Sequence, residues 1–312
     1  MRIIFVFCCI LSVVSYAQNQ VAITMDDLPF LQWPGNTSLT KLKASNERLL
    51  KAISTKRVPV AIFINEIDVD NSEKEAILKQ WLDNPLITGG NHSYAHKNFN
   101  QTPNAEFEAE ILKGEQLTKK LLKGTSKQLS YFRFPFNATG KDSASRFAME
   151  KFLNKNKYVL TPFTVESSDW LLNSLYLDAL KKNDLEKAKA IGEAYMQYTL
   201  EVFDYFEKLS MSEFGRNIKH IYLCHDNELN ADYFGQLMDK LKERNYSFIS
   251  LADALKDQAY QREDYYIGSS GMSWFYRWKK DPVVRQKLLR DSPDPDEKLL
   301  KEYQVLTSAK SN

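Results

Sequence analysis

The sequence predicts an α/β fold in which parallel strands form a barrel and helices surround it. Short apolar runs alternate with amphipathic stretches along most of the chain, which is typical of a parallel sheet with its helices outside. Seven strands within about 230 residues favour a barrel over an open sheet. The predicted strands, all rich in Val, Ile, Phe and Tyr, are Val21–Met25, Val58–Ile64, Pro85–Thr88, Leu129–Phe134, Tyr158–Val165, Ile218–Cys224 and Tyr246–Ser250.

Helices are expected between these strands. The segment 72–83 has a start signal at Asn71-Ser72, with Glu75 placed three residues after Ser72 as in a capping box. A longer helical stretch at 175–214 carries apolar residues at helical spacing. The remaining predicted helices cover 38–56, 104–123, 142–155 and 230–244.

The first residues have the layout of a secretory signal peptide. Arg2 precedes an apolar run at 3–14, and small residues follow at Ser15 and Ala17, so cleavage is expected after Ala17. A membrane anchor is the alternative, but about a dozen apolar residues are too few to cross a bilayer core of roughly 30 Å. We therefore expect a secreted or periplasmic protein with no membrane span after cleavage.

Composition restricts the partners further. The formal net charge is +2, and no basic run rich in aromatic residues occurs, so nucleic acid is not an expected partner. Loss of the leader removes Cys8 and Cys9 and leaves Cys224 alone, so no intramolecular disulfide can form. The fold must be stabilised by an ordinary core, and the sequence leaves the oligomeric state open.

Polar residues recur where the predicted strands end. In parallel barrels the chemistry lies at the carboxyl ends of the strands. Several separate segments deliver a carboxylate, a histidine or an arginine to that rim, namely Asp26, Asp27, His92, Arg133, Asp169 and His225.

Two short patterns suggest a metal site. His92 and His96 are four residues apart, which on a helical turn, or a turn entering a helix, points both imidazoles at one place. Two histidines and one carboxylate form the ligand set of a catalytic zinc ion. Asp26 and Asp27 are costly side by side at the end of an apolar strand unless a cation compensates them. The alternatives are two surface histidines at a helix start and a solvated Asp-Asp turn or helix cap.

Five motifs in order resemble the polysaccharide deacetylases, also called the NodB-homology domain or carbohydrate esterase family 4. They are Thr24-Met25-Asp26-Asp27, Asn91-His92-Ser93-Tyr94-Ala95-His96, Arg133-Phe134-Pro135-Phe136, Ser168-Asp169-Trp170 and Leu223-Cys224-His225. The resemblance covers roughly residues 20–255 and implies a distorted (β/α)7 barrel. It also implies that Asp27, His92 and His96 bind the metal.

The same resemblance implies the catalytic and substrate-binding residues. Asp26 would be the general base, oriented by Arg133, and His225 the general acid, tuned by Asp169. The alternative for His225 is a strand-end histidine satisfied by the backbone. Substrate contacts are expected from residues within the motifs, namely Phe136, Trp170 and Leu223.

The implied activity is hydrolytic deacetylation of a glycan or oligosaccharide. The substrate would be an N-acetylglucosamine-containing glycan or an acetylated polysaccharide, and the cofactor Zn2+, with Co2+ as another candidate. A catalytically inactive carbohydrate-binding relative, or a hydrolase of the superfamily acting on a non-sugar amide, are the alternatives. The sequence departs from the family pattern at Leu28, where Gly is usual, and at Glu166, where Asp is usual.

The resulting domain organisation has three parts: a signal peptide at 1–17, a catalytic domain at 18–255 that includes a helical insertion at 171–217, and a C-terminal extension at 256–312. Residues 265–278 are dense in aromatic side chains and form either a sugar-stacking lip or an apolar strap against the barrel. The strap is favoured because large aromatic side chains are usually buried. A solvated helix and a frayed end are expected beyond Asp281.

Overall fold

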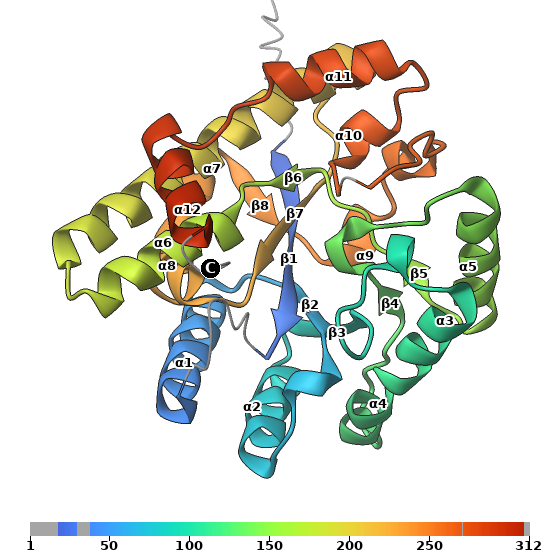
Figure 1. Ribbon diagram of the computed structural model, residues 1–312, viewed down its shortest axis with the longest axis horizontal. Helices are drawn as coiled ribbons and strands as arrows, with labels where there is room; N and C mark the ends of the chain where they lie inside the picture. The colour runs from blue at the N-terminus through green and yellow to red at the C-terminus, as the bar shows by residue number, and fades with distance from the viewer. Residues whose placement is uncertain (1–17, 30–37, 270, 309–312) are drawn as a thin grey trace, which may run out of the picture.

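Parallel strands form a curled half-barrel with helices around its outside (Figure 1). The computed structural model describes residues 18–29, 38–269 and 271–308, so the expected signal peptide lies outside the described residues. Seven strands follow one another in the order β5-β4-β3-β2-β1-β7-β6, and β8 pairs with the beginning of β1. This architecture confirms the distorted barrel expected from the sequence.

The long strand β1 (Asn19–Leu28) is the centre of the sheet, because it pairs with β2, β7 and β8. Most of its residues are buried, as expected for a parallel strand covered on both faces. The other strands are β2 (Val60–Ile64), β3 (Ile87–Asn91), β4 (Tyr131–Phe132), β5 (Val159–Leu160), β6 (Val165–Glu166), β7 (His220–His225) and β8 (Tyr246–Phe248).

The single strand expected at Tyr158–Val165 is wrong, since β5 and β6 lie at opposite ends of the strand order. The residues between them, 161–164, form a segment that we call the seam. Pro162 in its middle has no N–H to donate to a strand ladder. Because the seam is only four residues long, the two edges of the sheet must curl toward each other.

The seam carbonyls receive their hydrogen bonds from outside the sheet. The carbonyl of Phe163 accepts from the Trp274 N–H at 3.0 Å, and that of Thr164 accepts from the Ser273 hydroxyl at 2.7 Å. Buried polar backbone groups need such partners. The C-terminal extension therefore closes the barrel where strand pairing stops.

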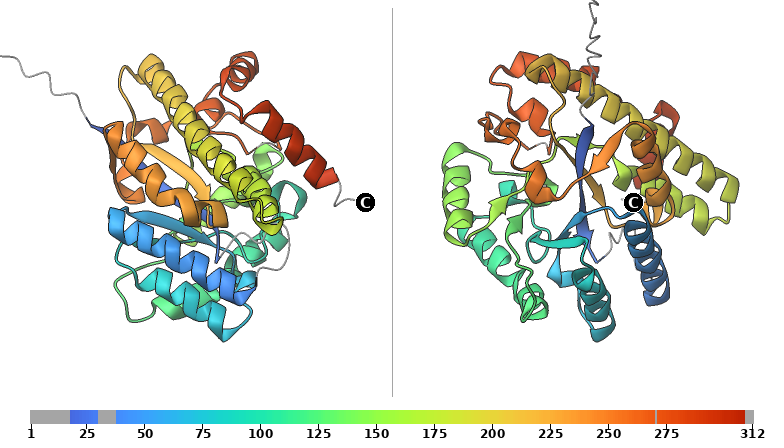
Figure 2. Two further views of the ribbon diagram at one scale, coloured as in Figure 1. Left: turned by 90° about the vertical axis from the view of Figure 1, so that its left-hand side faces the viewer. Right: turned by 180° about the vertical axis from the view of Figure 1, so that it is seen from behind.

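Helices lie around the outside of the sheet (Figures 1 and 2). Most predicted helices are confirmed, with shifted ends: α1 (Leu39–Lys56), α2 (Ser72–Asp83), α3 (Asn104–Lys113), α4 (Gln116–Leu122), α5 (Ser143–Lys155), α6 (Asp169–Lys181), α7 (Leu185–Phe214), α8 (Glu228–Glu243) and α9 (Leu251–Ala254). Short 3₁₀ turns cover Glu66–Asp68, Phe99–Gln101, Pro135–Asn137 and Gln258–Gln261. None of the described helices is long and apolar enough to cross a membrane.

Two helix predictions need correction. The helix expected at 104–123 is broken at Gly114, where a Cβ atom would lie 2.6 Å from the backbone of Ser93 and Tyr94. At α2 the cap is Asn71, whose side chain accepts hydrogen bonds from the backbone of residues 73 and 74, so Ser72 and Glu75 do not form the expected capping box.

The C-terminal extension contains α10 (Trp274–Arg277), α11 (Pro282–Asp291) and α12 (Glu297–Ser308). The aromatic residues of α10 are buried, as is Trp278, so this part is an apolar strap. Neither α11 nor α12 has a fully buried residue, as expected of a solvated end, although α12 also has a partly buried apolar face. That helix packs against α6, because apolar side chains such as Leu299 and Leu300 recur on one of its faces and contact the main core (Figures 1 and 2).

Candidate active site

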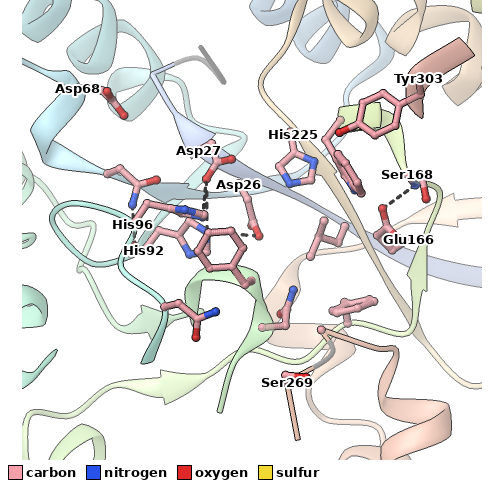
Figure 3. A pocket seen from close by; sticks show the side chains of 18 residues that line it. Asp26, Asp27, Asp68, His92, His96, Glu166, Ser168, His225, Ser269 and Tyr303 are labelled. Atoms are coloured by element: carbon pink, nitrogen blue, oxygen red, sulfur yellow. Dashed lines mark hydrogen bonds and ion pairs between the residues drawn. The ribbon is translucent and has the colours of Figure 1, made fainter. Parts of the chain in front are cut away.

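The end of β1 directs two neighbouring carboxylates into one pocket (Figure 3). In a regular strand, Asp26 and Asp27 would point to opposite faces. Here the pairing with β2 is irregular between Met25 and Leu28, and Asp27 has a left-handed φ of 64°. This local distortion lets both side chains line the pocket, as the sequence predicted.

His92 and His96 follow β3 in an irregular loop, so the expected helical turn is wrong. Ser93 and His96 have φ values of 66° and 51°, which no helix contains. The loop is held by tertiary contacts: the Asn65 side chain donates to the carbonyls of His92 and Ser93. These contacts, rather than helical spacing, bring the two imidazoles together.

Asp27, His92 and His96 form a cluster that could hold a metal ion, since their ligand atoms lie within 4.8 Å of one another. Asp27 Oδ1 is 3.5 Å from His92 Nε2 and 3.3 Å from His96 Nε2. A tetrahedral ion with bonds of about 2.0–2.2 Å separates its ligand atoms by roughly this distance. Asp27 Oδ1 is also buried without a hydrogen-bond partner, which a cation would supply. The residues therefore fit a divalent metal ion.

The protonation of this cluster suits metal binding. Burial lowers the pKa of His92 to about 4, so its ring is neutral at ordinary pH. Its Nδ1 lies 2.8 Å from the carbonyl oxygen of Arg133, which places the proton there and leaves Nε2 free as a ligand atom. Burial opposes ionisation of Asp27, but the nearby histidines outweigh it and lower the pKa of this carboxyl.

Asp26 is paired with a fully buried arginine. Arg133 follows β4, and its Nη1 donates to Asp26 Oδ1 at 2.7 Å and to the Thr24 hydroxyl at 2.8 Å. The same guanidinium donates to the seam carbonyls of Thr161 and Pro162. Arg133 therefore holds the Asp26 carboxylate in place and also supplies hydrogen-bond donors to two of the four seam carbonyls.

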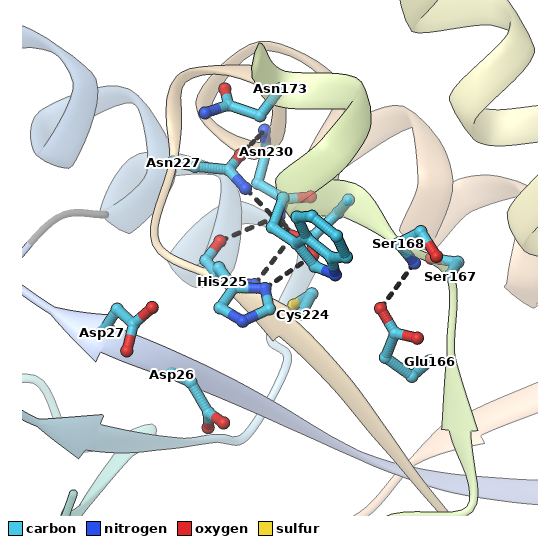
Figure 4. Close-up of polar contacts among 12 residues, drawn as sticks. Asp26, Asp27, Glu166, Ser167, Ser168, Asn173, Cys224, His225, Asn227 and Asn230 are labelled. Atoms are coloured by element: carbon cyan, nitrogen blue, oxygen red, sulfur yellow. Dashed lines mark hydrogen bonds and ion pairs between the residues drawn. The ribbon is translucent and has the colours of Figure 1, made fainter. Parts of the chain in front are cut away.

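His225 is paired with Asp169 on the other side of the pocket (Figure 4). Its Nδ1 is 2.6 Å from Asp169 Oδ1. Asp169 Oδ2 accepts three more hydrogen bonds, from the His225 N–H and from the side chains of Asn227 and Asn230. Burial disfavours the charged imidazole, but the Asp169 carboxylate outweighs it and raises the pKa of His225 to about 10. The ring thus bonds a carboxylate and not the backbone.

The pocket has a volume of about 870 Å³, large enough for a ligand of one or two sugar rings. Arg133 and Asp169 do not line it and lie behind Asp26 and His225. The other eight predicted site residues do line it: Asp26, Asp27, His92, His96, His225, Phe136, Trp170 and Leu223. Phe136 and Trp170 are 53% and 40% exposed, which leaves two aromatic surfaces open to a ligand.

Among the pocket residues without a role predicted from the sequence are Tyr303 and Glu166, of which one offers a ligand a ring and the other a carboxyl group. Tyr303 comes from α12, and no motif near it signals a site. Glu166 ends β6, and its departure from the family pattern was the only signal. Its Oε1 accepts a hydrogen bond from the Ser168 N–H at 2.5 Å. Burial and the negative charge of Asp169 raise the pKa of Glu166 to about 7.

The raised pKa of Glu166 predicts a pH-dependent stability. The folded state holds this proton up to about pH 7, whereas the unfolded chain loses it near pH 4.5. Stability should therefore fall as the pH rises between these values, by up to about 3 kcal/mol. Glu166→Gln removes this ionisation, so its free energy of unfolding relative to wild type should be higher at pH 8 than at pH 4.5. Urea denaturation at both pH values measures the difference, and an equal difference at both would contradict the prediction.

Comparisons with known proteins agree with this fold. The family model for polysaccharide deacetylase matches residues 14–158. No curated protein sequence matches the chain significantly. The chitin deacetylase of the fungal pathogen Colletotrichum lindemuthianum is 19% identical, with a TM-score of 0.53, and the match covers 77% of this chain and 88% of that one.

Relatives with and without activity share the fold. BA3943 from Bacillus anthracis, a family 4 pseudoenzyme, is 17% identical with a TM-score of 0.50, and the match covers 77% of this chain and 66% of that one. A BA3943 mutant with restored enzymatic activity is 18% identical with a TM-score of 0.50, covering 77% and 68%. At these identities the likeness concerns the fold alone.

The barrel, with its polar cluster at the carboxyl ends of the strands, has the fold of the carbohydrate esterase family 4 deacetylases. The match to the polysaccharide deacetylase family model, over residues 14–158, spans the part of this fold from β1 to α5.

Proposed function

We propose that this protein is an exported metal-dependent hydrolase that removes acetyl groups from an acetylated carbohydrate, an N-acetylglucosamine-containing glycan or an acetylated polysaccharide. One observation carries the proposal: a carboxylate paired with Arg133 and a histidine paired with Asp169 face the Asp27–His92–His96 cluster across one pocket. A pocket that only bound sugar would have no need of this arrangement.

Asp27, His92 and His96 would hold the metal, with Zn2+ as the first candidate and Co2+ as the second. When bound, the ion would polarise the acetyl carbonyl and acidify water at the site. Asp26 would take the proton from the attacking water, and the guanidinium of Arg133 holds this carboxylate in position. His225, protonated because of Asp169, would donate a proton to the leaving amine or hydroxyl.

The turn after β4 offers a donor for the developing oxyanion. The Asn137 N–H already donates to the Phe134 carbonyl at 2.9 Å, so the N–H of Phe136 is the candidate. Phe136 and Asn137 have φ values of 56° and 51°, and the turn needs support to keep this conformation. Arg277 of the strap gives it by donating to the Asn137 carbonyl at 3.2 Å.

Gly271→Ala should weaken catalysis through this turn. A Cβ atom at Gly271 would lie 2.2 Å from the Phe136 carbonyl oxygen, so the turn or the strap must shift. Overpacking of this kind costs about 1–3 kcal/mol of stability, and displacement of the turn should lower kcat by about 10- to 100-fold. Gly235→Ala is the control, because its Cβ would meet its neighbours at an ordinary 3.7 Å. Unchanged kcat in a folded Gly271→Ala protein would remove the turn from the mechanism.

The test of the proposed function is acetate release from N-acetylated chitooligosaccharides, peptidoglycan and acetylated xylan. Activity should disappear with a chelator and return on addition of zinc or cobalt. If no substrate releases acetate above the background of His92→Ala, the hydrolase proposal fails. Binding of a glycan without hydrolysis would then favour an inactive carbohydrate-binding protein, and hydrolysis of a non-sugar amide alone would favour a different substrate class.

A further inference from the structure

The reaction chemistry decides which side of the pocket holds the sugar. In the proposed deacetylation the leaving group is the sugar amine or hydroxyl, and it must reach the proton donor. That donor, His225, lies on the opposite side of Asp26 and Asp27 from His92 and His96 (Figure 3). The sugar must therefore lie on the His225 side, whereas the acetyl group points toward the metal-ligand cluster.

Three side chains without a part in the proton transfers line the pocket on that same side. Tyr303 of α12 and Glu166 at the end of β6 lie on that side (Figure 3), and Trp170 of α6 contacts the Tyr303 ring. The rings of Trp170 and Tyr303 meet edge to face, with centroids 5.8 Å apart and an interplanar angle of 80°. The Trp170 side chain also interacts with Glu166 and lowers its pKa. The three residues thus form one connected surface.

This surface has the chemistry of a sugar-binding site. A pyranose ring has an apolar C–H face, which an exposed aromatic ring can cover, and an edge of hydroxyl groups, which a carboxylate can accept hydrogen bonds from. Trp170 supplies the exposed ring, and Tyr303 holds its edge. The Glu166 carboxylate accepts from the Ser168 N–H and interacts with Trp170, and its two oxygens have further lone pairs that can accept from a ligand hydroxyl.

The position of Tyr303 is fixed by the rest of α12. Leu299, Leu300 and Leu306 pack against the main core, and Glu302 pairs with Lys187 of α7 at 2.7 Å. The helix therefore holds Tyr303 against Trp170 without help from a ligand. A site formed before the ligand arrives loses less entropy on binding.

We propose that Trp170, Tyr303 and Glu166 form a subsite for the pyranose ring on the leaving-group side, and that α12 thereby makes the protein select a sugar unit over a small acetyl compound. The proposal rests on the proposed deacetylase function. It assigns to the C-terminal helix a direct part in substrate recognition.

The test compares an N-acetylated chitobiose with p-nitrophenyl acetate, which has an acetyl group but no sugar ring. Tyr303→Ala should raise KM for the disaccharide by about 3- to 10-fold, the range expected for loss of one aromatic contact. At pH 8, where Glu166 is ionised, Glu166→Gln should raise it by about 5- to 10-fold, because the amide is a weaker acceptor than a carboxylate. Both variants should hydrolyse p-nitrophenyl acetate at the wild-type rate.

Val305→Ala is the matched control, since Val305 lies on the same helix and is 68% exposed. Tyr303→Phe keeps the ring and should restore wild-type KM. If Tyr303→Ala loses stability, Trp170→Phe gives a second measurement. This change reduces the aromatic surface that α6 contributes, so it should also raise KM for the disaccharide. Equal effects on both substrates, or none on either, would overturn the subsite.

The two proposals fail in different ways. A wild-type protein that releases acetate from none of the acetylated substrates contradicts the deacetylase function, and calorimetric titration with N-acetylated chitobiose then tests the subsite alone. Weaker binding by Tyr303→Ala and Glu166→Gln than by Val305→Ala would support the subsite even in an inactive protein. Identical binding by all variants would rule it out.

Discussion

Asp27→Ala is expected to abolish metal binding and with it the deacetylase activity. Asp27 Oδ1 is the atom that both histidine Nε2 atoms face, at 3.5 and 3.3 Å, and it is buried without another partner. Without this carboxylate, two imidazoles remain, too few to retain a catalytic ion. Since polarisation by the metal contributes several kcal/mol to the transition state, kcat should fall by about 10³-fold or more.

Metal analysis and activity together check this prediction. The purified wild-type protein, loaded with zinc, should carry about one ion per chain, and Asp27→Ala far less. Asp70→Ala is the control, because Asp70 is an exposed carboxylate whose side chain pairs with Lys74 on the surface. Full zinc occupancy in Asp27→Ala would remove this residue from the metal site, whatever its effect on activity.

Asp169→Asn is expected to lower activity by about 10²- to 10⁴-fold near pH 8, the contribution typical of a general acid. The Asp169 carboxylate raises the pKa of His225 to about 10, so the wild-type imidazole stays protonated through neutral pH. Removing the negative charge lets this pKa fall toward its ordinary value. Because the protonated form is the active one, the alkaline limb of the pH–rate profile should move to lower pH.

The pH profile separates this role from a structural one. Asp178→Asn is the control, as Asp178 lies on the same helix and pairs with Lys182 at the surface. It should leave the profile unchanged. If Asp169→Asn lowered kcat equally at every pH, without moving the alkaline limb, the carboxylate would not act by tuning His225.

Much of the site could be predicted because its residues follow strands that the hydrophobic pattern reveals. Asp26 pairs in register with His225 across β1 and β7. Two residues nearly 200 positions apart therefore meet, because the carboxyl ends of parallel strands lie at the same edge of a sheet. The metal cluster was predicted from the spacing of His92 and His96, the neighbouring Asp26 and Asp27, and the family resemblance. The pairing of Arg133 with Asp26 was implied by the family resemblance, since the sequence around an arginine at a strand end does not indicate which carboxylate it will pair with.

Other features could not be predicted because tertiary contacts decide them. The loop of His92 and His96 takes left-handed backbone angles at Ser93 and His96, which local sequence favours for neither residue. Asn65 and the close approach of Gly114 impose that conformation. Likewise, nothing in the apolar pattern of α12 indicates that Tyr303 reaches the pocket, because the pattern reveals an apolar face but not its partner.

The seam has a consequence for the order of folding. The carbonyls of Phe163 and Thr164 accept hydrogen bonds from Trp274 and Ser273, which lie about 110 residues further along the chain. Both donor residues are synthesised after β8, the last strand, so these contacts cannot form until the residues of the sheet have been made. During synthesis, all eight strands can emerge and pair while the gap between β5 and β6 still lacks its donors. The last step of barrel assembly is therefore the docking of the C-terminal strap, and until then the pocket has neither its support at Phe136 nor its wall at Tyr303.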